Sequence, residues 1–167
     1  MGLFDKFKTK TKLEELNISD DDIVAVADGK LIGVSNVSDA MFANKLLGDS
    51  IAFTYNQDKV TICSPANGTL MTMFPTGHAF GVKRSDGVEI LVHIGVNTVD
   101  TNGDGFKIEN HKQNDVVKAG EPIVTVDMKK LSKTYDMSTM LIITDANGID
   151  IQFIEPSDVK RGQSIIK

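Results

Sequence analysis

Short apolar runs separated by turn sequences dominate the chain from about residue 23 onward. The runs cover 23–26, 60–63, 88–93, 122–126, 140–143 and 163–166. Between them stand residue pairs that favour tight turns, at Asp28-Gly29, Asn67-Gly68, Asp86-Gly87, Asn102-Gly103 and Asn147-Gly148. Helical patterns are confined to two stretches, near 39–47 and 128–133. The pattern predicts an all-β protein, an antiparallel β sandwich or barrel with one or two short helices.

Two pairs of segments within the chain resemble each other. Residues 25–31 (AVADGKL) resemble 64–70 (SPANGTL), and residues 117–123 (VKAGEPI) resemble 159–165 (VKRGQSI). The distance along the chain from the first member to the second is similar in both pairs. Two copies are too few to stack as a solenoid. The repeats therefore predict an internally duplicated sandwich.

The first 22 residues differ from the rest of the chain and are interpreted as an N-terminal tail before a domain at 23–167. Within residues 1–12, apolar side chains that can share one helical face stand close to lysines; they are Leu3, Phe4 and Phe7, beside Lys6, Lys8, Lys10 and Lys12. This pattern is typical of a short amphipathic helix on an anionic membrane surface. The alternative is a disordered tail. The acidic run 19–22 then predicts a solvated linker.

Composition and charge narrow the classes of partner. With 18 Lys+Arg and 23 Asp+Glu, the 167-residue chain has a net charge of −5, which argues against nucleic acid and suits a basic protein partner. Cys63 is the one cysteine, so no internal disulfide can form, and a small core residue in a reducing cytoplasm is expected. No apolar run approaches the ~20 residues that span a bilayer. We expect a cytoplasmic monomer.

Two of the three histidines, His78 and His93, flank a predicted hairpin. Its strands are 80–83 and 88–94, and its turn is 85–87. Folding the chain at that turn brings His78 opposite residue 93 or 94, and facing residues of an antiparallel pair have Cβ atoms about 4.5–5.5 Å apart. The two imidazoles can therefore touch, and the glycines that flank them let a bulky ligand approach the backbone closely.

The residues alone leave the chemistry of such a pair open. Imidazole can act as a nucleophile or as an acid or base near neutral pH. Two neutral imidazoles can also bind zinc, which takes three or four protein ligands or keeps an open position. The third histidine, His111, lies in a polar run, and we expect it to be exposed to solvent.

Several segments resemble glucose-type enzyme IIA of the phosphoenolpyruvate-dependent sugar phosphotransferase system. The segments are 76–81 (TGHAFG), 85–99 (SDGVEILVHIGVNTV) and 103–106 (GDGF), with support from 64–69, 117–120 and Phe42 followed by 47–49. The similarity covers about residues 23–167. It implies a duplicated hybrid-motif β sandwich in which both histidines lie in a shallow depression.

The resemblance also implies roles for individual residues. As a phosphotransferase component, the protein would take a phosphoryl group on Nε2 of His93, with His78 hydrogen-bonded to that group and Thr76 placing His78. The donor would be the histidine phosphocarrier HPr, and the acceptor a cysteine on the IIB domain of a sugar permease. The apolar docking patch would comprise Met41, Phe42, Leu46, Leu47, Phe74 and Leu91.

Some positions depart from the family pattern. Asn97 stands where members usually carry aspartate, so we expect His93 to titrate lower than it would in an Asn97→Asp variant. The other departures affect backbone geometry: Val26, Ser38, Ala40 and Met140 stand where the family often has proline, and Ser50 stands where glycine is common.

Two alternatives use the same histidines. One is a zinc protein, either a metallopeptidase on a related duplicated sandwich or a regulatory zinc site, in which His78 and His93 would hold the metal; a peptidase would need a third ligand and a general base near them. The resemblance implies that zinc can also sit between these histidines in the phosphocarrier family, with a partner's carboxylate. The other is a regulatory module that accepts phosphate without passing it on. The phosphocarrier interpretation itself requires no cofactor.

Overall fold

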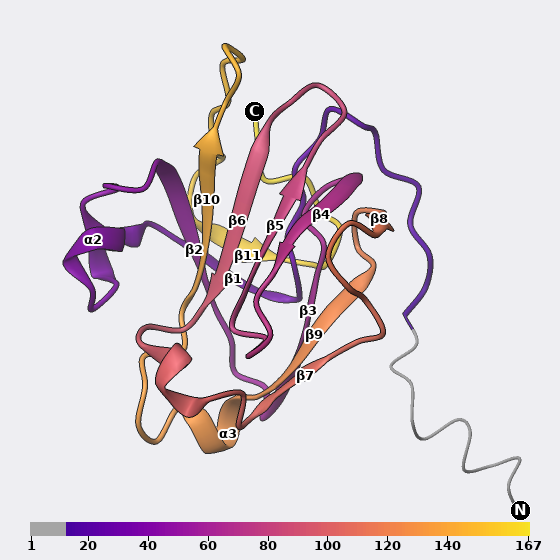
Figure 1. Ribbon diagram of the computed structural model, residues 1–167. Helices are drawn as coiled ribbons and strands as arrows, with labels where there is room; N and C mark the ends of the chain where they lie inside the picture. Colours follow the sequence, from indigo (N-terminus) through magenta and orange to yellow (C-terminus); the bar gives the residue numbers. More distant parts are fainter. Residues whose placement is uncertain (1–12) are drawn as a thin grey trace, which may run out of the picture.

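Two antiparallel sheets face each other in the structure, a computed structural model that describes residues 13–167 (Figure 1). The larger sheet has eight strands in the order β11-β1-β2-β10-β6-β5-β4-β8, and the smaller has three in the order β3-β9-β7. The strands are β1 (Gly29–Ile32), β2 (Asp49–Thr54), β3 (Lys59–Cys63), β4 (Gly68–Met73), β5 (Ala79–Lys83), β6 (Glu89–Ile94), β7 (Phe106–Ile108), β8 (Val116–Val117), β9 (Pro122–Asp127), β10 (Thr139–Asp145) and β11 (Ser157–Val159). The predicted all-β sandwich is confirmed.

The main core lies between the sheets and is built by alternation along the strands. On β6, Ile90, Val92 and Ile94 are fully buried in this core, whereas the intervening Leu91 and His93 belong to the opposite face. The same period places Phe80 and Val82 of β5 inside. Successive side chains of a strand point to opposite faces, so one strand supplies both the core and the site.

A second, smaller apolar cluster covers the outer face of the large sheet beside His93. Its buried members are Val34, Val37, Phe42, Ala52, Val96, Met140 and Ile142. They come from the sheet and from the segment that carries the 3₁₀ turn η1 (Val34–Asn36) and helix α2 (Ala40–Ala43). Figure 1 shows this segment projecting beside β2. The cluster holds Phe42 next to the histidine pair.

The predicted duplication is visible in the strand pairing. β1 pairs with β11 so that Gly29 lies opposite Val159, and β4 pairs with β8 so that Gly68 lies opposite Val117. The side-chain oxygens of Asp28 and Asn67, which precede the two glycines, accept equivalent backbone hydrogen bonds, each of 2.8 Å. The segments whose sequences resemble each other therefore occupy equivalent places in the two halves.

Residues 13–22 contact the duplicated domain along their length, although they form no helix or strand. Leu16 reaches Gly120 and Gly162, the glycines that the repeat makes equivalent. Asn67 donates a hydrogen bond to the Ile18 carbonyl, and the buried Arg84 donates one to the carbonyl of Asp21. In the run 19–22, which was expected to be a solvated linker, residues 19–21 are exposed, while the Asp21 carbonyl and the side chains of Asp20 and Asp22 accept hydrogen bonds from the domain. The amphipathic helix predicted within residues 1–12 lies outside the described residues.

Two of the predicted strands are wrong, and both predicted helices are shorter than their patterns. Residues 23–26 are buried, and so is Ile165 within 163–166, but the two segments form only isolated bridges, such as Val24 with Ser164. Val24 N donates to Pro65 O and Ala25 N donates to Gln163 O, but the pairing with either neighbour does not extend into a ladder. α2 covers four residues, as does α3 (Met128–Leu131). None of the helices within residues 13–167 is long and apolar enough to cross a membrane.

Candidate functional site

The two histidines come together through the β5–β6 hairpin. Ala79, the first residue of β5, lies directly opposite His93, and His78 lies just before β5 with its carbonyl accepting the Ile94 N–H at 2.7 Å. Regular alternation would send the His78 side chain toward the core with Ile94. His78 instead follows Gly77, whose φ of +78° turns the chain, and the two imidazole centroids are 5.3 Å apart with ring planes at 78°. The rings meet edge to face.

A backbone carbonyl determines which nitrogen of His93 is free. His93 Nδ1 lies 2.8 Å from the carbonyl oxygen of Gly95. A carbonyl can only accept a hydrogen bond, so Nδ1 carries the proton and neutral His93 presents an unprotonated Nε2. The Gly95 carbonyl is available because Gly95 has a φ of +77°, which glycine adopts readily. The orientation and the tautomer of His93 thus depend on one turn at the end of β6.

His78 is oriented by a side chain instead. The hydroxyl of Thr76 lies 2.6 Å from His78 Nδ1. If the hydroxyl donates to Nδ1, the proton of neutral His78 is on Nε2, and that N–H can donate to an anion beside His93. His78 is buried and His93 half-buried. The pair therefore combines one free nitrogen lone pair with one candidate donor.

Two phenylalanines frame the pair. The ring centroid of Phe42 lies 4.9 Å from that of His93, and the centroid of Phe74 lies 5.2 Å from that of His78. Phe42 belongs to α2, and Phe74 follows β4. Apolar rings on both sides restrict water and keep each imidazole in one place, which favours reactions that need a fixed nucleophile.

The surroundings favour the neutral form of both imidazoles. Burial lowers the pKa of His78. Burial also lowers the pKa of His93, and repulsion from His78 lowers it further, while the Gly95 carbonyl and the Asp39 carboxylate act in the opposite direction without cancelling the effect. A neutral His93 has the lone pair that a nucleophile needs.

Comparisons with known proteins bear directly on this pair. Residues 21–149 match the family model described as phosphoenolpyruvate-dependent sugar phosphotransferase system, EIIA 1. The chain belongs to this EIIA family. The resemblance noted in the sequence is therefore confirmed.

Several relatives show how far the similarity extends. The glucose-specific EIIA component of Mycoplasma capricolum is 36% identical over 144 residues, which cover 86% of this chain and 92% of the relative. The solved structure of glucose permease IIA from the same species superposes with a TM-score of 0.80 at 33% identity, covering 93% of this chain and 98% of that one. The glucose-specific EIICBA component of Staphylococcus carnosus is 33% identical over 145 residues, 86% of this chain but 21% of the relative.

The residues expected to form the family's docking patch differ in their exposure to solvent. Met41, Leu46, Leu47 and Phe74 are exposed, with Leu46 the most open at 71%. Phe42 is only 8% exposed because it packs into the outer cluster, and Leu91 packs against that cluster too. An exposed apolar rim with a firmly packed base is the usual form of a docking surface.

His111 is not where it was expected. Its side chain is only 12% exposed and lies between two carboxylates, with Nε2 2.8 Å from Glu121 and Nδ1 3.4 Å from Asp115. The prediction of a solvent-exposed histidine is wrong because Glu121, ten residues along the chain, returns to cover it. His111 follows β7, and its side chain pairs with Asp115 and Glu121 rather than with His78 or His93.

The described residues offer little for a resident metal. No group of three or more His, Cys, Asp or Glu side chains within residues 13–167 is arranged to hold one. His78 and His93 have Nε2 to offer, since each Nδ1 is engaged. Any zinc held there would need its remaining ligands from elsewhere.

Asn97, the departure from the family pattern, is exposed in the left-handed region with φ of 61°, at the start of the 3₁₀ turn η2 (Thr98–Thr101).

Proposed function

We propose that the protein accepts a phosphoryl group from the histidine phosphocarrier HPr on His93 and passes it to a cysteine on the IIB domain of a sugar permease. The observation that carries the proposal is the free Nε2 of His93, fixed by the Gly95 carbonyl and placed beside a second imidazole. Membership of the EIIA family supports it. The EIICBA relatives, named for glucose and for glucosides, support a sugar permease as the partner.

The geometry suits transfer in two displacement steps. Nε2 of His93 attacks the phosphorus, and a new N–P bond forms as the N–P bond to the donor histidine breaks. His78 donates from Nε2 to a phosphoryl oxygen, and Thr76 holds His78 in that orientation. In the second step the acceptor thiolate attacks phosphorus and Nε2 of His93 leaves with its lone pair. The protein's contribution is positioning and charge stabilisation, which dominate phosphoryl transfer.

The apolar rim explains how one site serves two partners. Met41, Leu46, Leu47 and Phe74 are exposed, Phe74 packs on His78, and their side chains offer contact area without fixed charge pairs. Such surfaces can be covered in turn by different proteins. The net charge of −5 also favours a basic donor.

The direct test is labelling from phosphoenolpyruvate through enzyme I and HPr. We expect the wild type to be labelled, His93→Ala to remain unlabelled, and His78→Ala to accept the label but pass it slowly to IIB. His111→Ala is the matched control, since this histidine is remote from the pair, and should be labelled normally. Label that survives His93→Ala would contradict the proposal, and label that never reaches IIB would favour a regulatory module.

The proposed reaction takes no metal or other cofactor. Labelling after exhaustive treatment with a chelator should therefore equal labelling of the untreated protein, with the magnesium needed by enzyme I restored beforehand. A loss of labelling that only zinc restores would favour the zinc-binding alternative at His78 and His93.

A further inference from the structure

We propose that Asp136 is a positioning residue for His93, acting through the peptide group between Gly95 and Val96. Asp136 lies in the loop between α3 and β10 and makes no hydrogen bond or ion pair with either paired imidazole within residues 13–167. The proposal rests on the proposed function, because the rate it affects is that of phosphoryl acceptance. The claim that Asp136 orients His93 rests on the hydrogen bonds that join this loop to the turn beneath His93.

The peptide group between Gly95 and Val96 is held at both ends. Its carbonyl accepts from His93 Nδ1 at 2.8 Å, and its N–H, on Val96, donates to the backbone carbonyl of Asp136 at 2.9 Å. The preceding N–H, on Gly95, donates to the Ser138 carbonyl at 2.9 Å. Hydrogen bonds in such a chain polarise one another, so the bond to Asp136 strengthens the Gly95 carbonyl as an acceptor.

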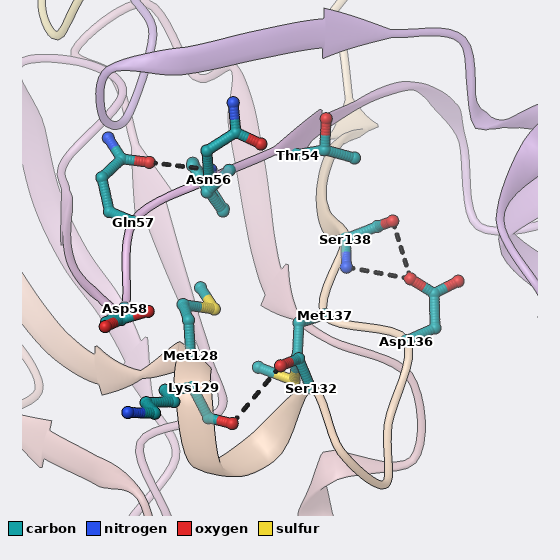
Figure 2. A pocket seen from close by; sticks show the side chains of 11 residues that line it. Thr54, Asn56, Gln57, Asp58, Met128, Lys129, Ser132, Asp136, Met137 and Ser138 are labelled. Atoms are coloured by element: carbon teal, nitrogen blue, oxygen red, sulfur yellow. Dashed lines mark hydrogen bonds between the residues drawn. The ribbon is translucent and has the colours of Figure 1, made fainter.

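The carboxylate of Asp136 shapes the loop that provides these carbonyls. Its Oδ1 accepts from the Ser138 backbone N–H at 3.0 Å and from the Ser138 hydroxyl at 2.8 Å, which closes a tight turn. Figure 2 shows this carboxylate and Ser138 facing each other at one side of a pocket of about 310 Å³. Burial opposes ionisation of Asp136, but hydrogen bonds from Ser138 and Ser38 outweigh it and lower the pKa of the carboxyl. Asp136 is therefore ionised at neutral pH.

The other carboxylate oxygen of Asp136 binds the segment that leads into α2, the helix that carries Phe42. Asp136 Oδ2 accepts from the backbone N–H of Ser38 at 3.1 Å. The next residue, Asp39, caps α2 by accepting from Met41 N at 2.8 Å, and α2 carries Phe42, whose ring lies against His93. One carboxylate thus connects the turn that orients His93 with the helix that packs on it.

Two substitutions separate these connections. In Asp136→Ala the side-chain bonds to Ser138 and to Ser38 are both lost, while the backbone carbonyl that accepts from Val96 remains. In Asp136→Asn the side-chain oxygen can still accept from Ser138, but an NH₂ group replaces Oδ2 and cannot accept from Ser38. Asp145→Ala is the matched control, because Asp145 also closes a turn, by accepting from Asn147 N at 2.8 Å, but at the far end of β10.

The tautomer of His93 is the primary readout, measured from the ¹⁵N chemical shifts of the imidazole. We expect wild type, Asp136→Asn and Asp145→Ala to keep the proton of neutral His93 on Nδ1, and Asp136→Ala to show a mixture of tautomers. Amide exchange at Ser38 should accelerate in both Asp136 variants. Thermal unfolding of each variant verifies that the fold persists.

The kinetic readout is the rate of phosphoryl acceptance from HPr. We expect a fall of about tenfold in Asp136→Ala, since small misplacements of a nucleophile are costly, and no change in Asp145→Ala. Unchanged ¹⁵N shifts and an unchanged rate in a folded Asp136→Ala protein would overturn the inference. Should the wild type accept no phosphoryl group at all, the proposed function fails, while the ¹⁵N shifts still decide whether Asp136 positions His93.

Discussion

Adding a single methyl group at Gly95 would measure how tightly the turn beneath His93 is packed. Gly95 has a φ of +77°, and a Cβ placed there would lie 2.5 Å from Thr98 Cγ2 and 3.0 Å from Met137 Sδ. The same residue provides the carbonyl that accepts from His93 Nδ1. Gly95→Ala therefore perturbs the backbone conformation, the packing and the orientation of His93 together.

The expected loss of stability has two parts. Holding an L-residue in the left-handed region costs about 1–2 kcal/mol. Relieving the overlap with Thr98 and Met137 costs about 1–3 kcal/mol more, as is typical when a packed site is overfilled. We therefore expect Gly95→Ala to lower the free energy of unfolding by about 2–5 kcal/mol.

Gly148→Ala provides the matched control. Gly148 also has a φ of +77°, but a Cβ there would have nothing within 4 Å. The substitution carries the same backbone cost and the same reduction in unfolded-state entropy, without the overlap. The difference between the two variants in urea unfolding isolates the packing contribution. A Thr98→Ser change in the Gly95→Ala background removes Cγ2, retains the hydroxyl that donates to the Ile94 carbonyl, and should restore part of the loss.

The ¹⁵N shifts of His93 complete the test. In Gly95→Ala the carbonyl moves, so the proton of neutral His93 should no longer be confined to Nδ1, whereas Gly148→Ala should leave the wild-type pattern. Equal losses of stability in Gly95→Ala and Gly148→Ala would refute the packing argument. A wild-type tautomer in Gly95→Ala would refute the role of the Gly95 carbonyl.

Three further predictions concern titration at the pair. His78→Ala should raise the pKa of His93, because it removes a like charge and admits water; an unchanged or lower pKa by NMR would show that His78 has little electrostatic effect on His93. In the wild type, the rate of labelling should hold steady down to the ordinary histidine pKa of 6.5 and decline only below it, since the neutral form reacts; a decline that begins above 6.5 would contradict this. Asn97→Asp should also raise the pKa of His93 by adding a negative charge nearby, and equal values in the two proteins would count against that effect.

Much of the fold could be predicted because its signals are local. The turn at 85–87 and the apolar runs on either side define the β5–β6 hairpin, and the predicted position of His78 opposite residue 93 or 94 agrees with the observed register. The repeated segments correctly indicated equivalent halves, since the first pair contains Gly29 and Gly68, at which β1 and β4 begin. Segments such as 23–26 were misjudged because their burial does not reveal that their pairing stops at isolated bridges.

The sequence by itself thus determined the sheet class, the duplication and the pairing of two histidine-bearing segments, all of which follow from alternation and turn chemistry over short distances. The family resemblance had implied that His93 reacts through Nε2, but only the tertiary structure showed that the Gly95 carbonyl engages Nδ1, how Phe42 packs on His93, and how Asp136 reaches both Ser138 and Ser38. It also placed His111 between two carboxylates rather than in solvent. These contacts join residues far apart in the chain, and their geometry depends on how the sheets and loops pack, for which a linear pattern carries no signal.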